Sequence, residues 1–420
     1  MTRWWAGVDW SEKLQDCAIV DEGGRVVTHL RVEERPAGVA QFVGALRELN
    51  LRSHRFSRRQ VPVAIEDGRR LFAAELQRLR QPVVVVPPAV VARHRGRLAT
   101  ASSKSDRTDA ALLANIVRMN PDRHRTVPET SDQATAIAMM ARAQQDAADR
   151  SRELMLSLRS HLVLYYPAAT EAWATMQYGL RRPEARAVLA QAPTPLAAAA
   201  LSKRKLAEAL AGAGRTRLVD NEAARLRELF AQPRLRQRPA TEEAMGARAA
   251  VLLADLSQAC THAQLLADRT DDLFSRHPHA AIYRSFPGCG PLIGARLFGE
   301  IGDDLERFAT ARGLCSYAGT APLTWASGGS RAVTHRKVAN RRLKATVHQW
   351  AFGTLTRSPG ARRLYDDRRE KGDGYASALR RVGGRLLSGL HHCLLHGELY
   401  SEEAMFGSGE ARDGPEAGQS

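Results

Sequence analysis

The segment WWAGVDWSEKLQDCAIVDEGGRVVTHLRVE, residues 4–33, decides the fold of the amino-terminal region. It contains three short apolar runs, and the turn residues Gly23 and Gly24 separate the second run from the third. Apolar runs of this length, bounded by turn residues, are typical of β-strands. The segment therefore predicts a three-stranded meander whose first strand ends at a carboxylate, Asp9.

A second carboxylate follows the fourth apolar run. In PVAIEDG, residues 62–68, Glu66 comes directly after Ile65. If this strand and the first one are neighbours in one sheet, Glu66 lies beside Asp9, since side chains at strand ends reach the cleft. Asp67 is a rival for the same position, and the residues alone do not separate the two.

The third group of acids lies in SKSDRTDAALLANIV, residues 103–117. Ser105 is a residue type that caps helices, and Asp106 and Asp109 are three residues apart, so they share one helical face. Four acids from three elements, Asp9, Glu66, Asp106 and Asp109, are thus expected to converge. A nuclease of the RNase H class would place a pair of divalent metal ions at such a position.

Clustered carboxylates repel one another, and divalent cations are the usual means of neutralising them. Hard oxygen ligands suit Mg²⁺ or Mn²⁺, and two ions about 3.5 to 4 Å apart can assist phosphoryl transfer. Each acid also has an ordinary explanation, as a strand-end turn residue, a helix cap or a first-turn acid that the helix dipole favours. Their order and spacing together favour the metal site.

The chain is expected to divide into three regions and a tail. Residues 1–125 alternate strand-like and helix-like segments, with helices expected at 36–49 and 69–79, and this pattern predicts an α/β domain with a mixed sheet. Residues 126–280 contain two long Ala-, Leu- and Arg-rich segments around a smaller insert, which predict an antiparallel coiled hairpin. The hairpin is interpreted as a dimerisation arm, and an internal helical bundle is the alternative.

The third region, residues 281–400, is predicted to be mainly helical. Its PGCGP turn resembles the hairpin of helix-hairpin-helix modules, in which Gly288 and Gly290 would let backbone N–H groups approach a DNA phosphate. A tight turn between helices is the alternative. The tail, residues 401–420, is rich in Gly, Ser and acids and is predicted to be disordered.

The charge of the chain indicates a nucleic-acid partner. It carries 62 Lys and Arg against 45 Asp and Glu, a formal charge of +17 with a pI near 10.3. The excess is concentrated after the segment WASGG, and phosphate backbones are its natural counterpart. The candidate nucleic-acid contacts are Arg331, Arg336, Lys337, Asn340, Arg341, Arg342 and Lys344.

Several classes of protein are excluded by missing patterns. No apolar run approaches the roughly 20 residues that span a bilayer, and the amino terminus lacks a signal pattern, so a cytoplasmic protein acting at the bacterial nucleoid is expected. No GxxxxGK[ST] loop is present, so no ATP is expected. The five cysteines lack the spacing of a zinc site.

Ser327 lies in the glycine-rich stretch WASGG, residues 325–329, with a cationic cluster after it. A serine in such a loop is ordinarily a turn residue. To attack a phosphodiester it would need a base or a metal to take its proton and cations to stabilise the developing charge. On these residues alone, both readings stay open.

The motifs GVDWSEK, AIEDG, SKSDRTDAALLA, SFPGCGPLIGARLFGEIGD, RFATARGLCSYAGTAPLTWASGG and NRRLK, in this order, resemble those of the transposases of the insertion-sequence one-ten family. The resemblance covers nearly the whole chain. It implies a RuvC-like domain with a DEDD acid set, a coiled-coil connection and a carboxy-terminal domain with a catalytic serine. The acids match Asp9, Glu66, Asp106 and Asp109, and the serine matches Ser327, with Ser330 the weaker candidate.

The resemblance also implies partners. It suggests a dimer or tetramer, donor and target DNA, and a structured guide RNA, or bridge RNA, from the noncoding end of the element. Two positions depart from the family pattern: Ala339 stands where a glycine is common, and Cys289 stands where an aliphatic residue is more usual. The first change bears on local backbone geometry, and the second should pack similarly.

The function expected from all this is metal-dependent DNA strand cleavage and exchange through a covalent phosphoserine. The alternative is a RuvC-like endonuclease or junction resolvase in which activated water does the chemistry. A non-catalytic protein that packages nucleic acid is a further rival. A tyrosine recombinase fits less well, because that class does not need four carboxylates.

Overall fold

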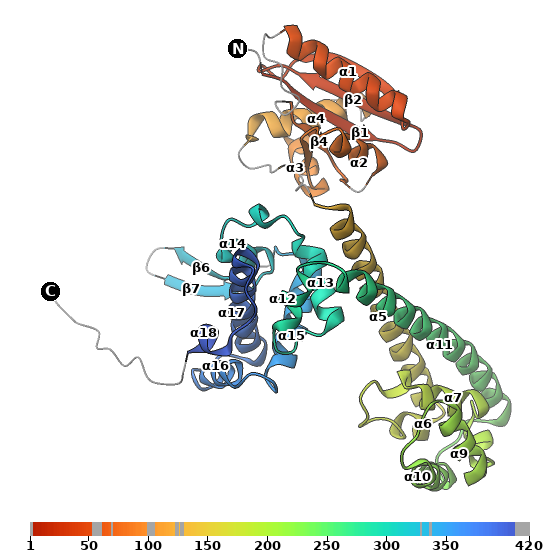
Figure 1. Cartoon of the computed structure of the whole chain (residues 1–420). Helices are drawn as coiled ribbons and strands as arrows, with labels where there is room; N and C mark the ends of the chain where they lie inside the picture. The colour runs from red at the N-terminus through yellow and green to blue at the C-terminus, as the bar shows by residue number, and fades with distance from the viewer. Residues whose placement is uncertain are drawn as a thin grey trace. The chain divides into compact units, whose positions relative to one another are not determined.

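The structure is a computed structural model, and it describes residues 3–52, 61–68, 70–98, 106–121, 126, 130–327, 330–335 and 338–407. Only the backbone is described for some of these residues, among them Asp106 and Ser327. The chain divides into two compact units, residues 1–129 and 130–420 (Figure 1). Each unit is described by itself.

The amino-terminal unit is built on a five-stranded mixed sheet with strand order β3-β2-β1-β4-β5. The predicted meander is confirmed, because β1 pairs antiparallel with β2 and β2 pairs antiparallel with β3. The fourth strand pairs in parallel with β1, and the fifth strand pairs in parallel with the fourth. The strands are β1 (Trp5–Trp10), β2 (Leu14–Val20), β3 (Val26–Glu33), β4 (Val63–Ile65) and β5 (Val83–Val85).

Helices cover both faces of this sheet, and each face has its own apolar core. Phe42 and Phe72 belong to the core under α1 and α2, while Trp5 and Leu113 belong to the core under α3 and α4. This three-layer α/β arrangement is consistent with the predicted RNase H-like domain. The helices are α1 (Pro36–Arg52), α2 (Leu71–Arg78), α3 (Pro88–Leu98) and α4 (Asp106–Met119).

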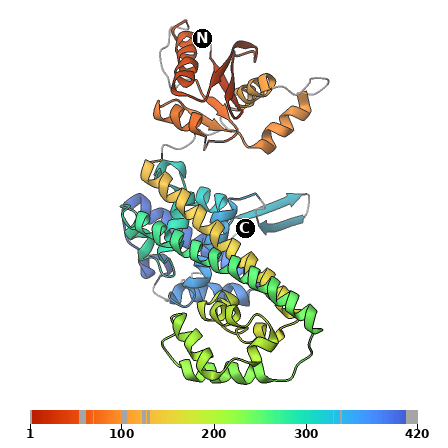
Figure 2. The same ribbon diagram turned by 90° about the vertical axis from the view of Figure 1, so that its right-hand side faces the viewer.

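The second unit contains two long helices, α5 (Asp132–Val163) and α11 (Pro239–Ser275), which lie side by side in Figure 2. His161, near the end of α5, contacts the carbonyl oxygen of Met245, near the start of α11, at 2.8 Å, so the helices run antiparallel. The predicted pair of long helices is thus confirmed. Its role as a dimerisation arm stays a prediction.

Short helices fill the insert between α5 and α11. They pack around a core of their own that includes Tyr166, Trp173 and Phe230. The insert is therefore a small helical subdomain at one end of the helix pair (Figure 2). Its helices are α6 (Pro167–Glu171), α7 (Pro183–Gln191), α8 (Pro195–Ala199), α9 (Lys203–Gly212) and α10 (Val219–Ala231).

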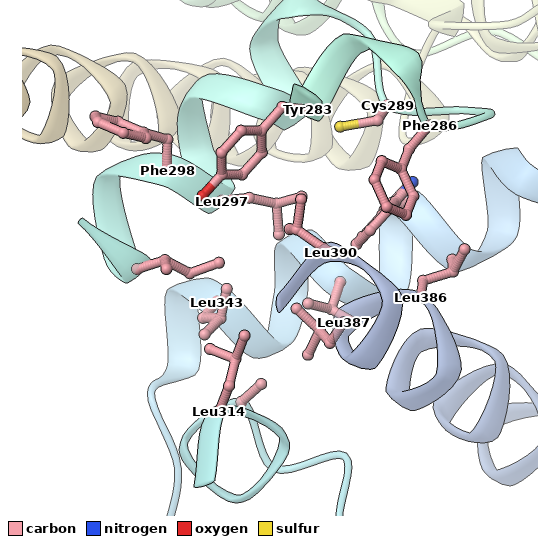
Figure 3. Close-up of a cluster of buried hydrophobic side chains, with 14 of the residues drawn as sticks. Tyr283, Phe286, Cys289, Leu297, Phe298, Leu314, Leu343, Leu386, Leu387 and Leu390 are labelled. Carbon is pink, nitrogen blue, oxygen red and sulfur yellow. The ribbon is translucent and has the colours of Figure 1, made fainter. Parts of the chain in front are cut away.

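The carboxy-terminal part is mainly helical, as predicted, and its core is the cluster in Figure 3. Leu314, Leu343 and Leu387 reach this core from three different helices. Cys289 is also buried there, which raises the pKa of its thiol to about 12, so it packs as an apolar side chain. The helices are α12 (Ala280–Ser285), α13 (Pro291–Ile301), α14 (Ala311–Tyr317), α15 (Arg341–Thr354), α16 (Pro359–Glu370) and α17 (Tyr375–His396).

The turn between α12 and α13 serves internal packing. Gly288 has φ +72°, and a Cβ atom added there would lie 2.8 Å from the amide nitrogen of Thr354 in α15. Gly288 therefore lets the backbone of the turn approach α15 closely. This agrees with the alternative stated above, a tight turn between helices. A phosphate contact stays a prediction for Gly290, around which the space is open.

The segment around Ser327 is a β-hairpin of β6 (Pro322–Ser327) and β7 (Ser330–His335), which the sequence analysis did not predict. The predicted disorder of the tail was wrong for its first residues. Residues 401–407 are ordered and include helix α18 (Glu402–Phe406), because buried Met405 packs into the core and Glu402 accepts a hydrogen bond from Gly360 N at 2.7 Å. The remainder of the tail lies outside the described residues.

Among the described helices, none combines the length and the hydropathy that a membrane span requires.

Candidate active site

The register of β1 and β4 places two of the predicted acids at neighbouring strand ends. The strands are parallel, and Val8 pairs with Ile65, so Asp9 and Glu66 are the next residues along each strand. Both are half-buried. Side chains alternate along a strand, so Asp9 lies on the same face as Gly7 and Glu66 on the same face as Ala64. This is the face that α4 covers, which favours Glu66 over Asp67 as the partner of Asp9.

Helix α4 crosses β1 at very close range because Gly7 has no side chain. A Cβ atom at Gly7 would lie 2.1 Å from the carbonyl oxygen of Ala110 and 2.6 Å from the amide nitrogen of Ala114. Further along α4, Asn115 donates a hydrogen bond to the carbonyl of Gly24 at 3.2 Å. These contacts fix the helix, and Asp109 stands one residue before the closest approach of α4 to β1, the strand that carries Asp9.

Asp109 is 8% exposed, and its carboxylate forms a 2.8 Å ion pair with Arg95 of α3. A buried charge needs a partner, and here the guanidinium supplies it. Arg95 keeps a large exposed surface, with 42% of its side chain accessible. The fourth acid, Asp106, begins α4, and its side chain lies outside the described part of the structure.

A cation–π contact lies next to the acids and escaped the sequence analysis. The guanidinium carbon of Arg70 lies 3.3 Å from the ring centroid of Trp10, the residue after Asp9. Arg70 belongs to the loop that follows Glu66, so the contact joins the ends of β1 and β4. Such a contact at an exposed site is worth about 0.5–1 kcal/mol.

The donor set has the chemistry of a Mg²⁺ or Mn²⁺ site, because every candidate ligand is a hard carboxylate oxygen. Among the residues with described side chains, no three acids, histidines or cysteines lie close enough together to form a metal cage. Asp106 is not part of that test, and Arg95 holds Asp109. The residues therefore fit a divalent ion in type, but Asp9, Glu66 and Asp109 are not close enough together to form a site by themselves, and the side chain of Asp106 is not described.

Ser327 is the last residue of β6 and pairs with Ser330, the first residue of β7. Both serines therefore stand at the turn end of the hairpin, with two glycines between them in the sequence. Figures 1 and 2 both show the hairpin extending away from the helices of its unit. The pairing places the two serines opposite one another. It does not show which of them is the nucleophile.

The structure assigns internal roles to two of the predicted nucleic-acid contacts. Arg342 forms a 2.7 Å ion pair with Asp146 of α5. Asn340 caps α15 and donates hydrogen bonds to Glu300 and Tyr317, so its side-chain groups are occupied within the protein.

The other predicted contacts are placed less completely. Arg341 is exposed at the start of α15, Lys344 is half-buried on the same helix, and Arg331 is described by its backbone in β7. Arg336 and Lys337 lie outside the described residues.

Comparison with known proteins identifies the chain. One family model, described as a transposase, matches residues 6–167, and a second, described as the transposase IS116/IS110/IS902 family, matches residues 280–366. The chain is 42% identical to the protein assigned as the mini-circle transposase for IS117 of Streptomyces coelicolor, over 95% of this chain and 96% of that protein. It is 26% identical to the 42 kDa protein of insertion element IS900 of Mycobacterium paratuberculosis, over 91% and 94% of the two chains.

These matches define a transposase, an enzyme that acts on DNA. The chain belongs to the IS116/IS110/IS902 family, the insertion-sequence one-ten family predicted from its motifs.

Proposed function

We propose that this transposase cuts and rejoins DNA through a phosphoserine intermediate formed by Ser327 and assisted by the acids Asp9, Glu66, Asp106 and Asp109. The observation that carries the proposal is the register of β1 and β4, which puts Asp9 beside Glu66 under the helix that bears the other two acids. With this function we also propose that residues 1–125 form a RuvC-like catalytic domain.

In the first step, Ser327 Oγ attacks a DNA phosphorus atom and forms a new P–O bond. The bond from phosphorus to one bridging oxygen breaks, and the serine proton passes through a carboxylate of the acid set to that departing oxygen. In the second step, the hydroxyl of a partner strand attacks the phosphoserine, and the serine leaves with a proton. One phosphoester bond forms for each one broken, so no ATP is needed.

The four acids would hold divalent ions, Mg²⁺ or Mn²⁺ and two in number, which when bound would neutralise the carboxylates and stabilise charge on the phosphate oxygens. The protein supplies the rigid part of this arrangement. Gly7 lets α4 approach β1, and the Arg70–Trp10 contact joins the two strand ends.

The family resemblance supports the partners that we propose. These are donor and target DNA, a structured bridge RNA from the element, and a homo-oligomer in which a serine of one copy works with the acids of another. The charge of +17 favours nucleic-acid partners of this kind. The helix pair of α5 and α11 would be a coiled-coil arm between copies.

The proposal is tested with purified full-length protein, RNA from the flank of the element, and donor and target DNA, with Mg²⁺ or with EDTA. Denaturing gels would resolve a covalent protein–DNA adduct and joined DNA strands. We expect both products with Mg²⁺ and neither with EDTA or in Asp9→Asn. DNA cleavage without any adduct would instead support a RuvC-like endonuclease that uses water.

Arg95 gives a prediction about metal affinity. Its guanidinium competes with a cation for Asp109, so Arg95→Gln should bind Mn²⁺ about tenfold more tightly, because removing the ion pair leaves a buried carboxylate in need of a cation. The measurement is calorimetric titration of Mn²⁺ without DNA. Arg93→Gln on the exposed side of the same helix is the matched control and should bind as wild type does. Weaker or unchanged binding in Arg95→Gln would contradict the competition.

A further inference from the structure

We propose that Asn340 is a positioning residue whose side chain, together with Tyr317 and Glu300, fastens the base of the β6–β7 hairpin. The inference rests on the proposed role of Ser327, which this hairpin carries. We call the contacts of Asn340 with Tyr317 and Glu300 the clasp. In this proposal Asn340 has a structural role inside the protein, in place of the nucleic-acid contact that its basic sequence neighbours suggested.

The two ends of the hairpin segment are attached differently. The leading end follows α14, where Ala318 and Ala321 are buried and the amide nitrogen of Thr320 donates to the carbonyl of Cys315 at 2.9 Å. On the trailing end, Val338 is 90% exposed. Buried apolar side chains therefore hold the leading end. Val338 is not held in this way, and at the trailing end Asn340 makes polar contacts instead.

Asn340 makes polar contacts with Tyr317, the residue at the leading end. Its amide nitrogen donates to the carbonyl oxygen of Tyr317 at 2.8 Å, and its Nδ2 donates to the Tyr317 hydroxyl at 2.7 Å. Tyr317 ends α14 just before the hairpin, and Asn340 follows the hairpin, so the two residues close the loop at its base. These bonds therefore join the segment that enters the hairpin to the segment that leaves it.

The clasp is anchored to a buried charge. Nδ2 of Asn340 also donates to Glu300 Oε2 at 2.7 Å, and Glu300 is 5% exposed. Arg142 of α5 binds the same carboxylate through two hydrogen bonds of 2.7 and 3.1 Å. Arg307 donates to the Tyr317 hydroxyl at 3.2 Å. Charge-assisted bonds of this kind are stronger than neutral ones, so the hairpin base is tied to α5 and α13.

The same side chain also caps α15, since Oδ1 accepts a hydrogen bond from Leu343 N at 2.9 Å. The two roles use different atoms and can be separated. Asp is as good a cap as Asn, but it offers no N–H to Glu300. In Asn340→Asp a second carboxylate would therefore face Glu300 where a 2.7 Å hydrogen bond was, and that bond would be lost.

Three substitutions test the clasp in the full-length protein. Asn340→Asp keeps the cap but removes the N–H donors to Glu300 and to the Tyr317 hydroxyl, so it should release the hairpin. Asn340→Ser keeps a capping oxygen but cannot reach Glu300, so it should also release the hairpin. Tyr317→Phe removes one acceptor and leaves the bond from Asn340 to Glu300, so it should have a smaller effect. Glu370→Gln, at the exposed end of α16, is a surface control for the handling of variants.

The first readout is hydrogen exchange of the amides at 322–335, compared with wild type at the same pH. The second is the rate of adduct formation by Ser327, which should fall about 10- to 100-fold wherever the hairpin is released, with DNA affinity unchanged. Exchange in Asn340→Asp and Asn340→Ser that equals wild type would overturn the clasp. Released exchange with an undiminished adduct rate would overturn its positioning role. If wild type forms no adduct, the proposed function fails, and exchange alone still decides the clasp.

Discussion

Ser327→Ala is expected to abolish the covalent protein–DNA adduct, with the rate falling about 1,000-fold or more. A catalytic serine whose oxygen forms the covalent bond has no substitute when that oxygen is removed, and loss of a nucleophile is among the largest single-residue effects in enzymes. The measurement is the denaturing-gel adduct assay with RNA, both DNA partners and Mg²⁺. Thermal unfolding should be unchanged, because Ser327 lies at the turn end of an extended hairpin.

Ser330→Ala is the matched control, because Ser330 pairs directly opposite Ser327 on the other strand of the hairpin. The two substitutions remove the same atom at neighbouring positions, so a difference between them cannot come from hairpin stability or charge. We expect Ser330→Ala to keep forming the adduct. An adduct that persists in Ser327→Ala but disappears in Ser330→Ala would show that Ser330 is the nucleophile. An adduct that persists in both variants would contradict a mechanism that uses either serine.

The sequence predicted the part of the fold whose signals are local. The apolar runs of residues 4–33 and the glycines between them were enough to predict the meander. They predicted Glu66 beside Asp9 only if the two strands are neighbours, and they left Asp67 as its rival. The partner of Asp109 was not predictable, because Arg95 precedes it by fourteen positions on a helix that the sequence analysis did not identify. An ion pair between helices depends on how they pack, which no local pattern encodes.

The hairpin around Ser327 was missed although the sequence contains its signal. Two glycines flanked by β-prone residues are a short hairpin pattern. Asn340 and Arg342 were assigned to nucleic acid because they lie in a basic run. Their partners within the chain, Glu300 and Asp146, are distant in the sequence, so only the packing of α13 and α5 against α15 shows these contacts. Nucleic-acid binding by the two residues stays a prediction.

Gly7→Ala should destabilise the amino-terminal unit by about 3 kcal/mol and remove adduct formation at the same time. The new Cβ atom would lie 2.1 Å from a backbone oxygen of α4, which has no flexible end to give way, so the helix as a whole must shift. Asp106 and Asp109 would move with it and away from Asp9. The measurements are calorimetric unfolding of the full-length protein and hydrogen exchange of the α4 amides.

Gly44→Ala is the matched control, with the same chemical change in the same unit. Gly44 lies on the exposed side of α1 with open space around its Cβ position, so this variant should be about 0.5 to 1 kcal/mol more stable, since alanine loses less backbone entropy in a helix. It should form the adduct as wild type does. Opposite signs for two glycine-to-alanine changes would show that the distance between α4 and β1, and not glycine content, sets the stability of this site. A Gly7→Ala protein that keeps both its stability and its adduct would mean that the acids of α4 do not need that close approach to work with Asp9.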